Sequence, residues 1–257
     1  MRIVIKVGTS TLTHATGRLN IRHVEALCKV LSDVKNAGHE LLLVSSGAIG
    51  MGVGKLNLPE RPTDMPTKQA AAAVGQCELM YVYDELFQAY NHTVAQILLT
   101  GEDLRDEGRH RNFINAAQRL LELGALPVIN ENDIVATDEI AVGDNDTLSA
   151  LVAVSVKADL LIILSDIDGL FTEDPRKNPD AKLIDTVTEI TPEMLAGASG
   201  GGTKLSTGGM VTKLAAAKLC MEAGADMIIC NSADPAVLYD ILDGKAVGTR
   251  FIGRKQA

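Results

Sequence analysis

The sequence predicts an α/β fold, a three-layer αβα sandwich in which helices cover both faces of a mainly parallel central sheet. One observation behind this prediction is that short β-branched runs alternate along the chain with longer stretches of helical periodicity, an order that builds parallel sheets. The other is composition. Hydrophobic residues make up 46% of the 257 residues, aromatic residues only 3%, and tryptophan is absent. A core of Ala, Val, Ile and Leu is typical of a sheet buried between helices.

In the first half of the chain, strands and helices alternate regularly. The predicted strands cover residues 3–7, 40–44, 93–99 and 126–129, and the predicted helices cover residues 22–37, 68–90, 111–123 and 147–157. Gly38 and Gly124 each follow a helix and stand just before a strand. Because glycine commonly ends a helix, both positions indicate a turn of the chain back into the sheet.

The second half begins near Ala158 with the most apolar strand. Its predicted elements are strands over residues 159–164 and 226–229 and helices over residues 211–223 and 235–243. Gly224 ends the first of these helices, and residues 173–207 show no periodicity, so we expect a lid or a small antiparallel excursion in that segment. We therefore predict a single domain over residues 1–257, with one lobe over residues 1–157 and a second over residues 158–257.

Composition and charge exclude several functions. The formal net charge of −9 argues against nucleic-acid and anionic-membrane partners, because both favour a basic surface. The four cysteines form no C-x-x-C pair, and the five histidines show no metal-ligand spacing. No apolar run approaches the ~18 residues of a membrane span. The chain opens directly in a strand pattern, so we expect no signal peptide and a cytoplasmic protein.

Four segments with small and polar residues follow predicted strands or open predicted helices. They are residues 6–10 (Lys-Val-Gly-Thr-Ser), 44–50 (Val-Ser-Ser-Gly-Ala-Ile-Gly), 165–170 (Ser-Asp-Ile-Asp-Gly-Leu) and 207–213 (Thr-Gly-Gly-Met-Val-Thr-Lys). None has the spacing of a Walker A loop. We interpret all four as strand-to-helix loops. Successive backbone N–H groups at such loops bind anions, and the dipole of the following helix strengthens the effect.

Each of these segments alone has an ordinary structural explanation. A glycine-rich turn is often only a tight turn, and Lys6 or Lys213 alone is more often a solvated surface charge. The combination is more informative, since two lysines and two glycine-rich loops are predicted at the same edge of a parallel sheet. Phosphoryl transfer depends mainly on positioning and on neutralising the charge of the phosphoryl oxygens. We therefore predict a phosphoryl-transfer site at this edge.

Two further polar segments lie at predicted element ends, residues 130–133 (Asn-Glu-Asn-Asp) and residues 143–147 (Gly-Asp-Asn-Asp-Thr). The second must supply an N-cap for the helix over residues 147–157, from Asp144, Asn145 or Asp146. An N-cap role accounts for only one of these polar side chains, and the others need a different explanation. Asparagine and aspartate at the carboxyl edge of a sheet are well suited to binding an ammonium or amide group.

At these residues the sequence resembles the amino acid kinase superfamily and, within it, the branch that phosphorylates the γ-carboxylate of glutamate. The matching segments are residues 6–10, 46–49, 130–133, 142–146, 166–170 and 208–213. They occur in the family's order and cover nearly the whole chain. The resemblance implies a sheet of eight mainly parallel strands, with the amino acid over the first half and ATP over the second. Many family members carry a further C-terminal PUA-type domain, and this sequence resembles the shorter, kinase-only form.

The resemblance also implies residue roles. Lys6 and Lys213 would flank the transferred phosphoryl group, and Asp146 would hold both lysines in place. The backbone of Gly8, Thr9 and Gly47 would bind phosphate oxygens. The residues implied in glutamate binding are Ser46, Gly47, Ala48, Asn130, Asp133, Asp144 and Asn145. The residues implied in ATP binding are Lys6, Ser165, Asp166, Thr207, Gly208, Gly209, Met210, Val211, Thr212 and Lys213.

The same resemblance implies ATP and Mg²⁺ as cofactors, with the ion on the β- and γ-phosphates and few or no direct protein ligands. It further implies feedback inhibition by proline at or overlapping the glutamate site, and association into dimers or tetramers. Two alternatives stay open. One is another amino acid kinase, acting on acetylglutamate, carbamate, aspartate or a nucleoside monophosphate. The other is a non-catalytic sensor of an amino acid or nucleotide.

Overall fold

Eight strands form one sheet within the part of the chain that the computed structural model describes, residues 1–14, 16, 18–136, 145–198 and 209–254. In chain order they are β1 (Arg2–Val7), β2 (Glu40–Ser45), β3 (Val94–Leu99), β4 (Leu126–Glu131), β5 (Leu160–Ser165), β6 (Thr186–Val187), β7 (Asp226–Asn231) and β8 (Thr249–Phe251). Their order across the sheet is β3-β4-β2-β1-β5-β7-β8-β6. The expected number of strands is confirmed.

The central strands all run in the same direction. β1 lies between β2 and β5 and pairs in parallel with both, so that Lys6 stands beside Val44 on one side and Ile163 on the other. Among the described strand pairs, only β7 and β8 are antiparallel. The carboxyl ends of β1, β2, β4 and β5 therefore meet at one edge of the sheet, as the prediction of a mainly parallel sheet requires.

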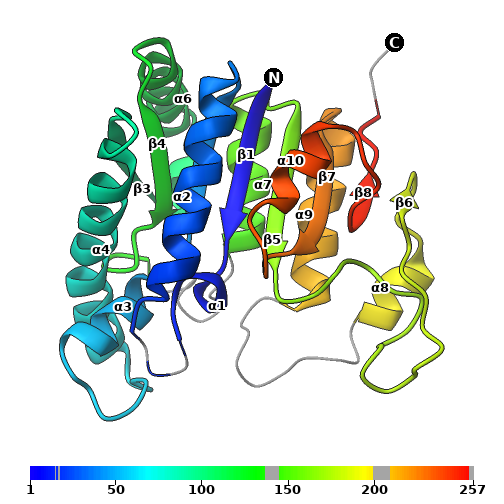
Figure 1. Ribbon diagram of the computed structural model, residues 1–257, viewed down its shortest axis with the longest axis horizontal. Helices are drawn as coiled ribbons and strands as arrows, with labels where there is room; N and C mark the ends of the chain where they lie inside the picture. The colour runs from blue at the N-terminus through cyan, green and yellow to red at the C-terminus, as the bar shows by residue number, and fades with distance from the viewer. Residues whose placement is uncertain (15, 17, 137–144, 199–208, 255–257) are drawn as a thin grey trace.

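Helices cover both faces of the sheet (Figure 1). The helices are α1 (Thr9–Leu12), α2 (Ile21–Asn36), α3 (Ala48–Lys55), α4 (Met65–Gln88), α5 (Gly101–Arg105), α6 (Glu107–Glu122), α7 (Asn145–Ser155), α8 (Pro192–Ala198), α9 (Met210–Ala223) and α10 (Val237–Leu242). One hydrophobic core joins the sheet to α6, α7 and α9, and a second joins it to α2, α4 and α10. The three-layer sandwich is confirmed.

Side chains along β1 alternate between the two faces of the sheet. Ile3, Ile5 and Val7 pack into the core beneath α2 and α4, whereas Val4 packs into the core beneath α7 and α9. Because side chains alternate with a period of two, Lys6 lies on the same face as Val4. The sequence of β1 thus directs one lysine toward α7 and α9. No described helix is long and apolar enough to span a bilayer.

The non-periodic segment, residues 173–207, was expected to form a lid or a small antiparallel excursion, and it also contains two elements that we had not predicted, β6 and α8. An antiparallel bridge joins Phe171 to Leu183, and β6 then adds to the edge of the sheet parallel to β8. α8 follows, and residues 199–207 lie outside the described residues. Residues 207 and 208 of the fourth segment lie outside the described residues. From Gly209 on, the segment opens α9, and the first turn of this helix lies at the carboxyl edge because α9 leads into the start of β7.

Candidate active site

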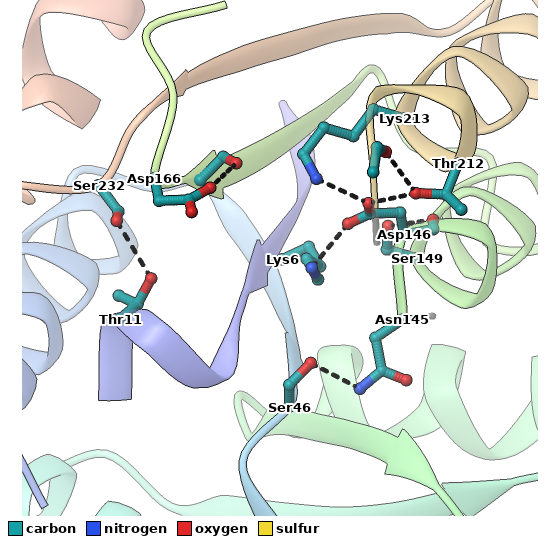
Figure 2. Close-up of polar contacts among 12 residues, drawn as sticks. Lys6, Thr11, Ser46, Asn145, Asp146, Ser149, Asp166, Thr212, Lys213 and Ser232 are labelled. Atoms are coloured by element: carbon teal, nitrogen blue, oxygen red, sulfur yellow. Dashed lines mark hydrogen bonds and ion pairs between the residues drawn. The ribbon is translucent and has the colours of Figure 1, made fainter. Parts of the chain in front are cut away.

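Two lysines and one aspartate meet at the carboxyl edge of the central strands. Lys6 Nζ lies 2.6 Å from Asp146 Oδ1, and Lys213 Nζ lies 3.0 Å from Asp146 Oδ2 (Figure 2). The exposed fractions of the three side chains are 10% for Lys6, 6% for Lys213 and 0% for Asp146. Each carboxylate oxygen is therefore paired with one cation in a site almost closed to bulk water.

Three different elements supply this cluster. Lys6 comes from the carboxyl end of strand β1, Asp146 from the first turn of α7 and Lys213 from the first turn of α9. A negative side chain at a helix N-terminus interacts favourably with the helix dipole, as Asp146 does. A positive side chain there does not, and Lys213 occupies that unfavourable end. Its ion pair with Asp146 compensates, so the aspartate is what allows two cations to converge.

Electrostatics keeps Asp146 ionised despite its burial. Burial by itself would raise the pKa of the carboxyl group, but the ammonium groups of Lys6 and Lys213 outweigh this effect and lower the pKa below its usual value. The cluster therefore carries two positive charges against one negative charge. Its remaining positive charge faces the edge where a phosphoryl group would lie.

Two hydroxyl groups also form hydrogen bonds with Asp146. Thr212 Oγ1 lies 3.1 Å from Asp146 Oδ2 and 2.8 Å from the carbonyl oxygen of Gly209. Ser149 Oγ donates to the carbonyl oxygen of Asp146 at 2.6 Å. Thr212 was predicted to bind ATP, and in the structure its side chain contacts the aspartate of the cluster. The sequence did not predict this contact, because residues 146 and 212 are far apart in the chain and no local pattern relates them.

A second polar cluster lies next to the first and is centred on Asn145. The Asn145 amide nitrogen donates to Ser46 Oγ at 3.0 Å, to Asn130 Oδ1 at 2.9 Å and to the carbonyl oxygen of Ser45 at 3.3 Å. Asn145 is the first residue of α7, beside Asp146. Three of the residues predicted to bind the amino acid, Ser46, Asn130 and Asn145, are therefore in direct contact.

Asn130 connects this cluster to Gln76, a residue that sequence reasoning missed. Asn130 Nδ2 donates to Gln76 Oε1 at 2.9 Å. Gln76 Nε2 is buried and makes no hydrogen bond to any described residue, so it has a donor to offer a ligand. The signal that could have found Gln76 is its place as the sole polar side chain in Ala-Ala-Ala-Ala-Val-Gly-Gln-Cys, residues 70–77.

Asp133 lies in a turn after β4, on a hollow of about 300 Å³ between α4 and the edge strand β3. Gln76 lines the same hollow, whereas Ser46 and Asn145 are not among its described lining residues. Burial raises the pKa of the Asp133 carboxyl group to about 6. A carboxylate with such a desolvation cost is stabilised by a cationic ligand group. The residues predicted for the amino acid thus form two linked groups, bridged by Asn130 and Gln76.

Two turns bring backbone N–H groups to the same edge. Gly8 precedes α1, and Gly47 precedes α3 with φ at 105°, a left-handed conformation that glycine adopts without strain. The first N–H groups of a helix have no acceptor within the helix, which leaves those near Thr9 and Ala48 for a ligand. Gly75 of α4 packs directly against the second turn. A Cβ atom at position 75 would lie only 1.7 Å from the carbonyl oxygen of Ala48.

Apart from Lys6, the described residues that were predicted to bind ATP lie near the end of β5 and at the start of α9. Ser165 is the buried last residue of β5, and its hydroxyl group lies 3.2 Å from exposed Asp166 Oδ1. Gly209 and Met210 are half-buried at the start of α9, and Val211 is exposed. Thr207 and Gly208 of the nucleotide prediction and Asp144 of the glutamate prediction lie outside the described residues. The roles of all these residues stay predictions.

Comparison with known proteins identifies the family. The model of the amino acid kinase family matches residues 1–231. The glutamate 5-kinase of Clostridium perfringens is 52% identical over 258 residues, which cover 99% of this chain and 96% of that protein. The glutamate 5-kinase of Caldanaerobacter subterraneus is also 52% identical, over 99% of this chain and 68% of its own length.

Solved structures of similar fold are more distant in sequence. Carbamate kinase from Giardia lamblia, bound to AMP-PNP, aligns with a TM-score of 0.68 at 19% identity and covers 98% of both chains. UMP kinase from Bacillus anthracis aligns with a TM-score of 0.63 at 16% identity, over 98% of this chain and 95% of that one. At these identities the likeness concerns the fold alone.

Proposed function

The chain belongs to the amino acid kinase family, and on that basis we propose that it phosphorylates the γ-carboxylate of L-glutamate with ATP. The products are L-glutamyl 5-phosphate and ADP, and the reaction is the first step of proline biosynthesis. Relatives named glutamate 5-kinase share about half of their residues with this chain over nearly its full length. The other kinases of the family and a non-catalytic sensor are not favoured.

The observation that supports phosphoryl transfer best is the buried Lys6–Asp146–Lys213 cluster. The γ-carboxylate of glutamate and the γ-phosphate of ATP are both negative and repel each other. Two ammonium groups held 2.6 Å and 3.0 Å from one carboxylate supply fixed positive charge in a water-poor site. Preorganised charge of this kind contributes more to transition-state stabilisation than the same charge in water.

The chemistry needs no general base. A carboxylate oxygen of glutamate attacks the γ-phosphorus, the new O–P bond forms, and the bond from that phosphorus to the β–γ bridging oxygen breaks. The electron pair of the broken bond leaves with ADP, and no proton is transferred. Lys6 and Lys213 neutralise the oxygens of the transferred group, while Asp146 holds the two lysines, which otherwise repel each other.

The amino acid is proposed to lie over the linked polar clusters. Ser46, Asn130 and Asn145 offer hydroxyl and amide groups. Gln76 Nε2, which has no hydrogen-bond partner among the described residues, offers a donor to a carboxylate oxygen. Asp133 is proposed as the partner of the α-ammonium group. Gly47, Ala48 and Asp144 are proposed as neighbouring contacts, and the turns at Gly8, Thr9 and Gly47 as backbone donors to phosphate oxygens.

The nucleotide is proposed to lie over Ser165, Asp166 and the start of α9, with Thr207 and Gly208 from the preceding segment. Among the described residues there is no group of three or more His, Cys, Asp or Glu side chains able to cage a metal ion. We propose that Mg²⁺ is carried by the β- and γ-phosphates of ATP, since Mg²⁺ keeps several waters and few protein ligands in such sites. When bound, the ion would supply further neutralisation of phosphate charge.

Four further properties are part of the proposal. The residues over 1–157 would bind the amino acid and those over 158–257 the nucleotide, on one continuous sheet. Proline would compete with glutamate for the same polar clusters, and the protein would act in the cytoplasm as a dimer or tetramer. These properties are proposed from the resemblance to the family, and the proposed phosphoryl-transfer chemistry does not depend on them.

A substrate panel tests the proposed function. Hydroxylamine converts an acyl phosphate into a hydroxamate. Hydroxamate formed from ATP and a candidate acceptor therefore reports phosphorylation of the acceptor's carboxylate directly. We expect hydroxamate with glutamate and little with acetylglutamate, aspartate or carbamate. Hydroxamate from acetylglutamate but not from glutamate would overturn the substrate assignment. Adding proline to the glutamate reaction tests inhibition in the same assay.

A further inference from the structure

We propose that a buried hydrogen bond between Thr11 and Ser232 is a positioning element that aligns the two halves of the phosphoryl-transfer site. Thr11 Oγ1 donates to Ser232 Oγ at 3.1 Å, and the two residues are 3% and 8% exposed. Figure 2 shows the two side chains pointing toward each other beside Asp166. The inference rests on the proposed function, because it concerns the alignment of the donor with the acceptor.

The first end of this bridge is the turn that follows Lys6. Thr11 lies in α1, which begins directly after Gly8, and the Thr11 N–H group donates to the carbonyl oxygen of Gly8 at 3.1 Å. α1 has only four residues, so it has little internal stability of its own. A contact that holds Thr11 therefore also holds the backbone at Gly8 and Thr9.

The second end of the bridge is the strand end on the nucleotide side. Ser232 follows β7, and its N–H group donates to the carbonyl oxygen of Ser165 at 2.7 Å. Strand β7 pairs with β5 up to Ser165 and Asn231. Two hydrogen bonds thus connect Thr11, through Ser232, to the residue immediately before Asp166. The bridge joins residues 221 positions apart in the sequence.

The bridge should affect the rate of phosphoryl transfer because of where its two ends lie. In the proposed site, Lys6 and Gly8 contact the phosphoryl group that passes to the acceptor, and Ser165 and Asp166 belong to the nucleotide side. Phosphoryl transfer depends on the distance and alignment between donor and acceptor, and a misplacement of about 1 Å can cost about 100-fold in rate. Without the bridge, α1 and the β7 strand end lose their direct side-chain connection.

The alternative is that the pair only satisfies two buried hydroxyl groups, as many core hydroxyls do. The two readings differ in what removal of a hydroxyl changes. A purely structural pair affects stability and leaves the kinetics of the folded protein intact. A positioning pair lowers kcat of the folded protein, and the two residues act as one unit.

The test compares Thr11→Val, Ser232→Ala and the double variant in the full chain, by the hydroxamate assay and thermal unfolding. Thr11→Ser keeps the hydroxyl group and serves as the conservative variant. Ser155→Ala is the matched control, because Ser155 Oγ also makes a partly buried side-chain hydrogen bond, 2.7 Å to His110 Nε2, at the far end of α7. Each variant is assayed below its own unfolding temperature.

We expect Thr11→Val and Ser232→Ala each to lower kcat by about tenfold or more, with the KM for glutamate changed by less than about twofold. The double variant should be no slower than the slower single variant, because the two residues share one interaction. Thr11→Ser should restore kcat to within about threefold of the unsubstituted protein. Ser155→Ala should lower the unfolding temperature and leave kcat unchanged.

Two results would overturn the proposal. One is a kcat within about twofold of the unsubstituted protein for both single variants; the other is multiplicative losses in the double variant. Hydrogen exchange provides a readout that does not depend on activity, since Thr11→Val should speed exchange in the backbone over residues 8–13. If the unsubstituted protein forms no acyl phosphate, the proposed function fails, and unchanged exchange in Thr11→Val separately refutes the bridge.

Discussion

Replacing Asp146 by asparagine removes the charge that both lysines share and preserves the size of the side chain. In the structure, Asp146 is fully buried and pairs with Lys6 and Lys213 at 2.6 Å and 3.0 Å. The variant therefore removes the carboxylate that pairs with both ammonium groups, in a site mostly shielded from water. We expect both folding stability and turnover to suffer, for related reasons.

The magnitude follows from the burial of the cluster. Removing one partner of a buried ion pair costs about 3–5 kcal/mol, because the remaining charge is left uncompensated. We expect Asp146→Asn to lower the free energy of unfolding by about this amount at neutral pH. Misplaced lysines should lower kcat by about 10²–10³-fold, the effect of losing one preorganised charge-stabilising group.

The stability difference should also depend on pH. The pKa of Asp146 is lowered in the folded protein, so its contribution to stability is present above the unfolded pKa of about 4. That contribution is lost as the pH falls through the lowered folded pKa. The difference in unfolding free energy between the unsubstituted protein and Asp146→Asn should therefore narrow in acid.

Urea unfolding followed by circular dichroism measures the stability, and hydroxamate formation measures the rate. Asp240→Asn is the control, because Asp240 pairs with Lys245 on the surface and both side chains are well exposed; an exposed pair contributes only about 0–1 kcal/mol. The reasoning is refuted if Asp146→Asn keeps its stability within about 1 kcal/mol and its kcat within about threefold.

Three further predictions concern single side chains. Lys213→Ala should lower kcat by about 10²-fold or more while calorimetry shows glutamate affinity within about threefold; an unchanged kcat removes the lysine from the reaction. Burial raises the pKa of Asp133 to about 6, so glutamate should bind about tenfold tighter per pH unit up to that value and then level off. Calorimetry should show no such slope for Asp133→Asn; a slope that persists contradicts the ammonium contact. Gly75→Ala would place a Cβ atom 1.7 Å from the carbonyl oxygen of Ala48, and we expect it to lower the unfolding free energy by about 1–3 kcal/mol or more. Gly108→Ala, with its nearest neighbour a flexible carboxylate oxygen at 3.3 Å, should be neutral or stabilising in urea unfolding, and equal losses in the two variants would refute the close-packing argument.

The sequence predicted the main strands and helices because their signals are local. Periodicity identified six strands of the sheet, and glycines at 38, 124 and 224 marked helix ends, where the structure places all three at positive φ. The starts of helices were less accurate. α4 begins at Met65, three residues earlier than predicted, because Asp64 caps it by accepting from the Thr67 N–H group.

The elements that were missed have weak local signals. β6 and β8 contain two and three residues, and strands this short show no recognisable alternation of apolar and polar side chains. They exist because each adds to the edge of a sheet whose other strands are already in place.

The candidate site was partly predictable for a similar reason. Lys6 and Asn145 lie at element ends, where sequence position and sheet geometry together indicate the carboxyl edge. The contact of Thr212 with Asp146 and the link from Asn130 to Gln76 join distant parts of the chain, and no local pattern encodes them. The resemblance to a known family supplied roles that periodicity and composition could not.

The central claim is that an oxygen of the γ-carboxylate of glutamate attacks the γ-phosphorus of ATP. Glutamate labelled with ¹⁸O in its γ-carboxylate tests this directly when the acyl phosphate is trapped with hydroxylamine. Attack of hydroxylamine at the carbonyl carbon releases phosphate that keeps the oxygen bridging carbon and phosphorus. We predict one ¹⁸O atom in each phosphate released, by mass spectrometry, in proportion to the hydroxamate formed. Phosphate without the label would contradict the account, because it would show that the γ-phosphoryl group passes to water instead.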